Sequence, residues 1–590
     1  MKYVRKWTSL MLVALLSLAL AGCAGGPECT QAQFDAFLEQ EFVDAVTSEY
    51  LALYIYVSDP QQYGIDKAKI PVNLGARNTL ESRKQNREEI ERSLRGLKSF
   101  RREQLDPKQQ DSYDIYLFYL ERAQALSQEK FDYFDDSFSD TGIYTQLPTM
   151  FADFRLHTEQ DIADLIGLME DTRPYLQSCI TFAKMQQEKG MLSVNCDAVM
   201  EYCSGILKEG EHSAVLESIK SGIDALEIDA AKKRDYQEEM AQVFRTSFLP
   251  AYQDLMDAMA DLKAKGAQPK PLAEMPSGKE YYEALLQYSV GTAAPLFQYK
   301  LKLEAGLGAA LADMYQILSR EGTLERFISA DLSTGYTDYR VMLGDLEQLI
   351  KGHFPDIGDV EYTIEPIAPA LAVNTIAAYF NIPTLDGSEP ELIKVNTTRA
   401  SASITDLETF MTVAHEGFPG HLYQYGYMRK NLKDQPLRQI YAISGYTEGY
   451  AKYVEALAAG YLELDSELVE LYCLNAMASG YITILADVGV HGEGWTRQQA
   501  RDFLMKSGIP EGSFDAIYEQ IVANPGIFLP YYGGQMEFSQ LRKQAEETLG
   551  SDFDEVAFHE EILRYGPVSF DFLKLKLDAY LATQKLPQAA

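Results

Sequence analysis

The sequence predicts a mainly α-helical fold, in which two helical lobes surround a deep cleft and a small β-sheet lies beside one histidine-bearing helix. Apolar residues recur at helical spacing over most of the chain, as at Tyr113, Tyr116 and Leu120, which places them on one face of a helix. Strand character is strongest at 360–364 and 392–395. The hydrophobic content of 46% and charged content of 24% are ordinary for a globular protein and argue against disorder.

Helix boundaries are clearest where capping signals occur. Asp106 followed by Pro107 predicts a helix start, because aspartate caps free amide groups and proline suits the first helical position. Thr496 with Gln499 forms a capping-box pattern, and the helix that it opens should end near Gly508. Further helical patterns fill residues 35–60, 80–130, 160–190 and 235–264.

A glycine- and proline-rich segment at 266–278 marks the boundary between the two predicted lobes. We expect an N-terminal helical lobe at 35–265 and a C-terminal catalytic lobe at 280–590. The same segment could instead join two helices of one unit.

The N-terminus has the features of a bacterial export signal. Basic residues precede an apolar run at 10–21, which is too short to span a bilayer. The run leads into Leu-Ala-Gly-Cys at 20–23, which resembles a lipobox. By that resemblance, residues 1–22 are removed, Cys23 carries the lipid, and residues 23–34 form a tether. We therefore expect a membrane-anchored lipoprotein of the cell envelope; an ordinary secretory signal would give the same compartment without the anchor.

The chain is strongly acidic, with 53 basic and 87 acidic residues and a formal charge of −34. Such a surface repels phosphate backbones, so nucleic acid is not an expected partner. The acidity fits a solvated surface, or alternatively a field that attracts cationic substrates or metal ions. No feature of the sequence indicates an oligomeric state.

The cysteines do not predict a metal site. Five remain besides Cys23, and the absence of a Cys-x-x-Cys pair argues against a thiolate zinc site. Cys196 and Cys203 lie seven residues apart, so one local disulfide is plausible.

The chemistry is concentrated at two histidines separated by six residues. His415 is followed by Glu416, and His421 comes after a Pro419-Gly420 pair. Two neutral imidazoles can bind zinc, and a neighbouring carboxylate can take a proton from water. On an unbroken helix these histidines would point about 240° apart. We expect Pro419 and Gly420 to interrupt the helix and bring His421 to the metal.

A third ligand is expected from a helix farther along the chain. Glu448 and Glu455 would share one helix face about 10 Å apart, so one ion cannot bind both directly. We assign Glu448 as the third ligand and Glu455 as a residue that orients an imidazole or Lys452. The reverse assignment remains open.

These motifs resemble a known bacterial family. His415–His421 with Gln424, and Glu448-Gly449-Tyr450 with Glu455, are similar to the signature of domain-of-unknown-function family 885, which is grouped with zincin-like peptidases. Further similar segments are Asp487–His491, Tyr531 with Gly534, Leu541-Arg542 and Phe558-His559. The family more often has Trp where Tyr450 stands. The resemblance implies a helical zincin-like fold and a zinc hydrolase.

Several residues in these motifs are candidates for binding the substrate. Tyr531 and His491 could donate to the oxygen that becomes negative during peptide hydrolysis, although Tyr531 could be a packed aromatic and His491 a structural partner of Asp487. Arg542 could bind a substrate carboxylate or form a helix-surface ion pair. Gln424 and Asp487 are candidates for contacts with the metal ligands or with the substrate.

The leading hypothesis is a zinc peptidase in which His415, His421 and Glu448 hold Zn²⁺ and Glu416 acts as general base on oligopeptides. A second hydrolase hypothesis replaces the peptide with another amide or an ester. The alternative from another class is an inactive surface lipoprotein that binds peptides or partners. The presence of Glu416 and both histidines counts against this alternative.

Overall fold

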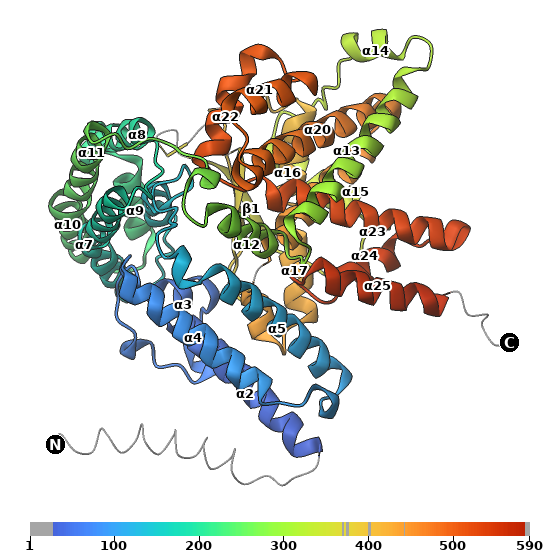
Figure 1. Cartoon of the computed structure of the whole chain (residues 1–590). Coiled ribbons are helices and arrows are strands. Elements are labelled where there is room, and N and C mark those ends of the chain that lie inside the picture. The colour runs from blue at the N-terminus through green and yellow to red at the C-terminus, as the bar shows by residue number, and fades with distance from the viewer. Residues whose placement is uncertain (1–26, 368–370, 373–376, 399–402, 442, 585–590) are drawn as a thin grey trace.

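The computed structural model describes residues 27–584 except 368–370, 373–376, 399–402 and 442. The predicted signal peptide and Cys23 lie outside the described residues. Helices make up most of the described chain, and three strands form one small sheet (Figure 1). The prediction of a mainly α-helical fold with a small sheet is confirmed.

The first group of helices packs around its own apolar core. It comprises α2 (Pro27–Thr47), α3 (Tyr50–Tyr56), α4 (Leu80–Lys98) and α5 (Pro107–Leu126). The start of α2 corrects the predicted tether at 23–34: Phe34 is fully buried, and its ring meets that of Phe100 at 5.3 Å. The predicted start of α5 is confirmed, since the Asp106 side chain accepts a hydrogen bond from the Gln109 amide.

A second group of helices surrounds a second core, seen at the left of Figure 1. It comprises α6 (Ile143–Ala152), α7 (Glu159–Glu188), α8 (Cys196–Glu209), α9 (Ala214–Ala225), α10 (Ala230–Val243) and α11 (Leu249–Ala264). Cys196 and Cys203 are both free thiols on α8, which corrects the predicted disulfide. Seven helical residues separate two cysteines by about 10 Å along the axis, beyond the reach of a disulfide.

The remaining helices build the largest core. They are α12 (Gly278–Val290), α13 (Leu296–Leu318), α14 (Thr323–Ser329), α15 (Tyr339–Leu349), α16 (Leu407–Glu416), α17 (His421–Asn431), α18 (Pro436–Ile440), α19 (Ser444–Gly460), α20 (Ser466–Asp487), α21 (Arg497–Lys506), α22 (Phe514–Ala523), α23 (Gly534–Leu549), α24 (Glu555–Leu563) and α25 (Phe570–Gln584). The Thr496 capping box opens α21 as predicted. Ile115, Phe131 and Met191 also belong to this core, so apolar packing crosses the predicted lobe boundary, and the division into two lobes stays a prediction.

The sheet lies beside α16. Its strands are β1 (Tyr362–Pro366), β2 (Ala378–Asn381) and β3 (Glu391–Val395), in the order β1-β3-β2. β1 runs parallel to β3, and β2 runs antiparallel to it, with Phe380 opposite Ile393. β1 and β3 match the predicted strands, whereas β2 was not predicted. Within the described sheet, β2 is an edge strand that contacts α16.

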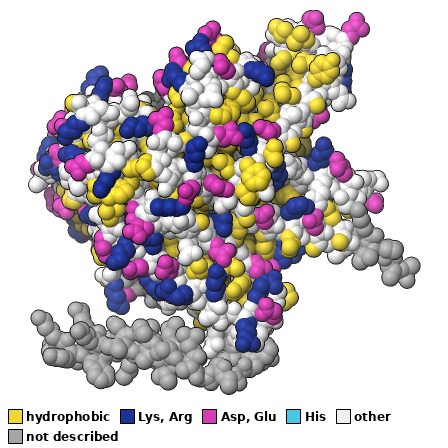
Figure 2. Space-filling model, viewed as in Figure 1, with side chains coloured by type: hydrophobic (Ala, Val, Ile, Leu, Met, Phe, Trp, Pro, Cys, Tyr) yellow, Lys and Arg dark blue, Asp and Glu magenta, His cyan; other side chains and the backbone are white. Residues whose placement is uncertain are grey.

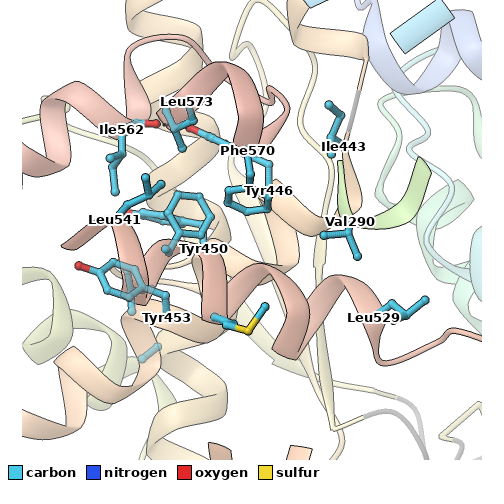
Figure 3. Packing of buried hydrophobic residues seen from close by; sticks show 14 of the residues in the cluster. Val290, Ile443, Tyr446, Tyr450, Tyr453, Leu529, Leu541, Ile562, Phe570 and Leu573 are labelled. Atoms are coloured by element: carbon cyan, nitrogen blue, oxygen red, sulfur yellow. Dashed lines mark hydrogen bonds between the residues drawn. The ribbon is translucent and has the colours of Figure 1, made fainter. Parts of the chain in front are cut away.

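One apolar face of α19 fixes this helix in the core. Tyr446, Tyr450 and Tyr453 pack among side chains of α23, α24 and α25 (Figure 3). The Tyr446 hydroxyl donates a hydrogen bond of 2.8 Å to the Ile562 carbonyl. Because such burial restricts both rotation and translation of the helix, residues on its opposite face keep fixed positions.

Residues Ser466–Glu493, which include α20, form a stretch long and apolar enough to cross a membrane. Half of its most apolar window is buried inside the protein, and α13 packs along it. Burial of this kind is typical of a core helix as well.

Candidate metal centre

A break between two helices brings the two motif histidines together. α16 ends at Glu416 and α17 begins at His421, so the predicted interruption is confirmed. The Gly420 amide donates a hydrogen bond of 3.0 Å to the Ala414 carbonyl. A Cβ atom at Gly420 would lie 1.8 Å from the His415 carbonyl oxygen. The chain can therefore fold back at this point only with glycine.

Gly420→Ala should destabilise the protein by about 1–3 kcal/mol, because an extra methyl in a tightly packed site forces the backbone to shift. Thermal or urea unfolding followed by circular dichroism measures this. Gly344→Ala is the matched control: Gly344 lies within α15, and an added Cβ there meets no atom within 4 Å. That change should instead stabilise the helix by about 0.5–1 kcal/mol. Equal effects at both positions would contradict the steric argument.

Three side chains converge at the break. The rings of His415 and His421 lie 4.8 Å apart and perpendicular to one another. Glu448, on α19, places Oε2 3.3 Å from Nε2 of His415 and 3.4 Å from Nε2 of His421. The ligand atoms of the three residues all lie within 4.8 Å of one another. Both histidines are 8% exposed, so the cluster is largely shielded from water.

The donor set and its spacing fit a zinc ion. Zinc is commonly held by two histidines and a carboxylate, with a fourth position left for water. Bond lengths of about 2.0–2.1 Å in a tetrahedral site set neighbouring ligand atoms about 3.3–3.4 Å apart. The two distances from the Glu448 oxygen match this spacing.

Glu455 holds the other side of the His415 ring. Its Oε1 lies 2.7 Å from Nδ1 of His415, and its Oε2 accepts a hydrogen bond of 2.6 Å from Nζ of Lys452. A histidine ligand often donates its second N–H to a carboxylate, which fixes the tautomer that binds metal through Nε2. The geometry therefore supports Glu448 as the ligand and Glu455 as the orienting residue, the assignment made from the sequence.

Glu455→Gln should weaken zinc binding by about 10–100-fold, the range for loss of an outer partner of a ligand. The amide can still accept a hydrogen bond from His415, but it lacks the charge that makes the imidazole a stronger donor to metal. Competition with a chelator of known affinity measures the change. An unchanged zinc affinity would contradict this role for Glu455.

Charges within the cluster favour the charged forms of His415 and Glu448. Burial lowers the pKa of His415, but the hydrogen-bonded Glu448 and Glu455 outweigh burial and raise it to about 10. Burial raises the pKa of Glu448, but the charges of His421 and His415 outweigh this and hold it well below its usual range. An anionic ligand is thus favoured, and a metal ion would compete with the proton on His415. Burial raises the pKa of Glu416, which brings a general base closer to neutrality.

The cluster lies at one wall of a cavity of about 510 Å³. Asp140 from the N-terminal half, Phe380 of β2 and Asn524 after α22 line it together with Glu416. An Asp140–Asn524 contact joins the two halves, since the Asn524 amide donates a hydrogen bond of 2.9 Å to the Asp140 carboxylate.

Sequence reasoning missed most residues of this wall. Glu408 and Thr412 precede Glu416 by eight and four residues on α16 and also line the cavity, so helical spacing could have found them. Asp140 and Phe380 carried no comparable signal, because only the tertiary fold brings them to the cavity.

Tyr531 faces the same cavity. Its ring stacks at 6.2 Å from the ring of His415. Burial and the nearby Glu448 and Glu416 raise the pKa of Tyr531 well above its usual value, so its hydroxyl stays protonated and able to donate. Tyr531 lies in a π-helical segment, η10 (Leu529–Gly533), that runs directly into α23.

Glycines let η10 and α23 approach α19. A Cβ atom at Gly449 would lie 2.3 Å from the Cα atom of Gly534, and one at Gly534 would lie 1.9 Å from the Gly445 carbonyl oxygen. The two helices therefore meet through their backbones. Glu448 directly precedes Gly449, and Tyr531 lies three residues before Gly534. The contact therefore sets the distance between the two segments that carry Glu448 and Tyr531.

Comparison with known proteins agrees with the resemblance of the motifs. A model of the family described as "Bacterial protein of unknown function (DUF885)" matches residues 73–577. The chain belongs to the DUF885 family. The match covers most of both predicted lobes of this DUF885 protein. Curated proteins give no match.

Two solved structures resemble this DUF885 protein. One is the crystal structure of an inferred lipoprotein from Colwellia psychrerythraea, with a TM-score of 0.79 and 18% identity over 94% of this chain and 99% of that chain. The other is an inferred lipoprotein of unknown function from Shewanella oneidensis, with a TM-score of 0.61 and 16% identity over 92% and 98% of the two chains. At these identities, the similarity shows a shared fold.

His491 does not line the cavity, although it lies in a segment that resembles the family signature. It is fully buried, its Nδ1 accepts a hydrogen bond from the Leu272 amide, and its Nε2 lies 2.9 Å from the Ile521 carbonyl oxygen. The predicted donation to a substrate oxygen is therefore wrong, because both ring nitrogens already have partners. The Asp487 carboxylate lies 3.5 Å from Nε2 of His491 and accepts a hydrogen bond from the Gly526 amide. The hydrogen bond from Gly526 to Asp487 fixes the loop before η10. Burial raises the pKa of Asp487 to about 8.

Arg542 and Gln424 also lie outside the cavity wall of this DUF885 protein. Arg542 donates to Glu555 at 2.6 Å and to Glu546 at 2.7 Å. These partners correct the predicted role of Arg542 in substrate binding, in favour of the ion pair considered beside it. Gln424 is buried on α17, and neither of its amide atoms has a hydrogen-bond partner in the described chain.

Proposed function

We propose that this chain is a zinc-dependent hydrolase that cleaves peptides. The observation that carries the proposal is the position of the Glu448 oxygen, 3.3 and 3.4 Å from the Nε2 atoms of His415 and His421. A zinc ion held by these three residues would keep a fourth coordination position for water on the side of the cavity. Catalytic zinc sites have such a free position, whereas purely structural sites do not.

The residues around the proposed metal suit amide hydrolysis. When bound, zinc would act as a Lewis acid and would lower the pKa of a water molecule at this site. Glu416 accepts the proton of the attacking water and returns it to the departing amine nitrogen. The Tyr531 hydroxyl donates to the carbonyl oxygen as negative charge develops there. Glu455 keeps the His415 ring in one orientation throughout.

Peptides are favoured over smaller amides or esters by the strand at the cavity wall. Ala378, Tyr379 and Phe380 of β2 line the cavity, and β2 has a strand neighbour on one side only in the described sheet. An extended peptide can pair with a free strand edge through its backbone. A small ester or amide would leave most of this edge unused.

We place this activity outside the cytoplasm, on a lipid-anchored protein. The Leu-Ala-Gly-Cys sequence ending at Cys23 supports this proposal. The two solved structures with the same fold, which are themselves inferred lipoproteins, support it as well.

The test combines metal content with substrate class. The purified chain should hold about one zinc per molecule, hydrolyse members of a peptide library, lose this activity to a chelator and regain it when zinc is restored. Hydrolysis of small esters or amides but of no peptide would favour the other hydrolase class. Far less than one zinc per chain after reconstitution would favour a binding protein.

A further inference from the structure

The outer face of α13 and its neighbours carry an extended apolar surface. Among the described residues, ten large hydrophobic side chains are strongly exposed, and seven of them lie between 297 and 341. The seven are Phe297, Leu301, Leu311, Tyr315, Leu324, Ile328 and Val341. Figure 2 shows hydrophobic atoms gathered at the upper right, over α13 and α14. Large apolar patches on soluble proteins commonly mark interaction sites.

Four of these side chains form one stripe along α13. Phe297, Leu301, Leu311 and Tyr315 are 64%, 59%, 47% and 75% exposed. At 3.6 residues per turn they fall within an arc of about 80° on the helix surface. α13 packs on α20 elsewhere on its surface, so the stripe has no partner within the described chain.

The stripe is symmetric about residue 306. Phe297 and Tyr315 lie nine residues to either side of this position, and Leu301 and Leu311 lie five residues to either side. Two antiparallel copies of α13 with a two-fold axis at residue 306 would place Leu301 against the partner's Leu311. The same axis would place Phe297 against the partner's Tyr315. A two-fold interface has to be self-complementary in this way.

We propose that the α13 stripe is the centre of a symmetric dimer interface, occupied by a second copy of this chain. At about 200 Å² for a residue of this size, the four exposed fractions amount to roughly 1,000 Å² in two chains. Flanking residues would bring the buried area to the roughly 1,200 Å² at which stable interfaces begin.

Polar residues of α13 suit the same antiparallel register. Glu304 and Gly308 lie two residues to either side of the axis, so the acidic side chain meets a residue without a side chain. Lys300 already has acidic partners within its own chain: its Nζ lies 2.6 Å from a Glu493 oxygen and 3.8 Å from a Glu304 oxygen. The charge of Glu304 at the contact is therefore partly balanced.

A membrane is a poor occupant for this surface. In Figure 1, α14 lies at the opposite end of the molecule from the start of α2, where the chain leads toward Cys23. The four residues 23–26 span at most about 14 Å. A lipid on Cys23 would therefore hold the start of α2 at the bilayer and leave α13 and α14 facing away from it.

Sedimentation velocity on residues 27–590, which contain every described element, tests the proposal. We expect twice the mass of one chain at micromolar concentration. Leu301→Asp should halve the mass, whereas Leu575→Asp, at a leucine of α25 that is 63% exposed, should leave the dimer intact. A monomeric wild type, or loss of the dimer in both variants, would overturn the proposal.

A charge exchange tests the register and guards against misfolded variants. Leu301→Lys and Leu311→Asp should each give a monomer, and the double variant should regain the dimer, because each lysine then meets the partner's aspartate. Residues 301 and 311 lie about 15 Å apart on one helix, so they cannot pair within a chain. A double variant that folds, judged by its melting temperature, yet stays monomeric would overturn the proposed axis. Binding of the wild type to phosphatidylcholine vesicles, lost in Leu301→Asp, would also overturn it in favour of a membrane.

Discussion

Glu416→Gln is expected to lower kcat for peptide hydrolysis by about 10²–10⁴-fold, the range for loss of a general base. Glutamine has almost the same shape as glutamate but cannot accept a proton from water at neutral pH. Because Glu416 is not among the three clustered ligand residues, zinc binding should be retained. Initial rates on a peptide substrate, together with zinc measured by atomic absorption, check both parts.

Glu408→Gln is the matched control for this prediction. Glu408 lines the same cavity and lies two helical turns before Glu416 on α16, but it is not part of the ligand cluster. Its substitution should change kcat only slightly. Substantial hydrolysis by Glu416→Gln with zinc fully bound would remove Glu416 from the proposed mechanism.

Glu448→Ala is expected to reduce zinc affinity by more than about 100-fold, beyond the range for loss of an outer partner such as Glu455. The change removes the oxygen that lies between the two imidazoles and leaves a site with two protein ligands. Activity at limiting zinc should fall in parallel. Isothermal titration of the metal-free protein with zinc measures the affinity directly.

A ligand replacement separates lost coordination from a damaged fold. Glu448→His supplies another zinc donor at the same position on α19 and should recover part of the affinity that Glu448→Ala loses. Full zinc affinity in Glu448→Ala would show that the carboxylate is not a ligand, and the assignment of the third donor would have to change.

The sequence was sufficient for the parts of the site that depend on local backbone geometry. His415, Glu416 and His421 lie close together in the chain, and the effect of Pro419 and Gly420 on a helix follows from known backbone preferences. Glu448 was harder to place because it lies 33 residues from His415. The seven-residue spacing to Glu455 nevertheless showed that a single ion could bind only one of the two.

Prediction failed where the direction of a side chain depends on tertiary packing. His491 and Arg542 lie in segments that resemble the family signature. The sequence does not reveal that His491 is hydrogen-bonded to the backbone of Leu272 and Ile521 or that Arg542 pairs with Glu555. Asp140 reaches the cavity from the opposite half of the chain. A four-residue strand such as β2 gives too short a pattern to distinguish from a loop.

The contact between Gly449 and Gly534 links the integrity of the fold to the chemistry. No side chain lies between the two backbones at this crossing. A shift of either helix therefore cannot be accommodated by the rotation of a side chain. A methyl group added at Gly449 or Gly534 would increase the distance between the segment that carries Tyr531 and the segment that carries Glu448. Substitution of either glycine would therefore lower the proposed hydrolase activity, although every residue proposed to react remains in the chain.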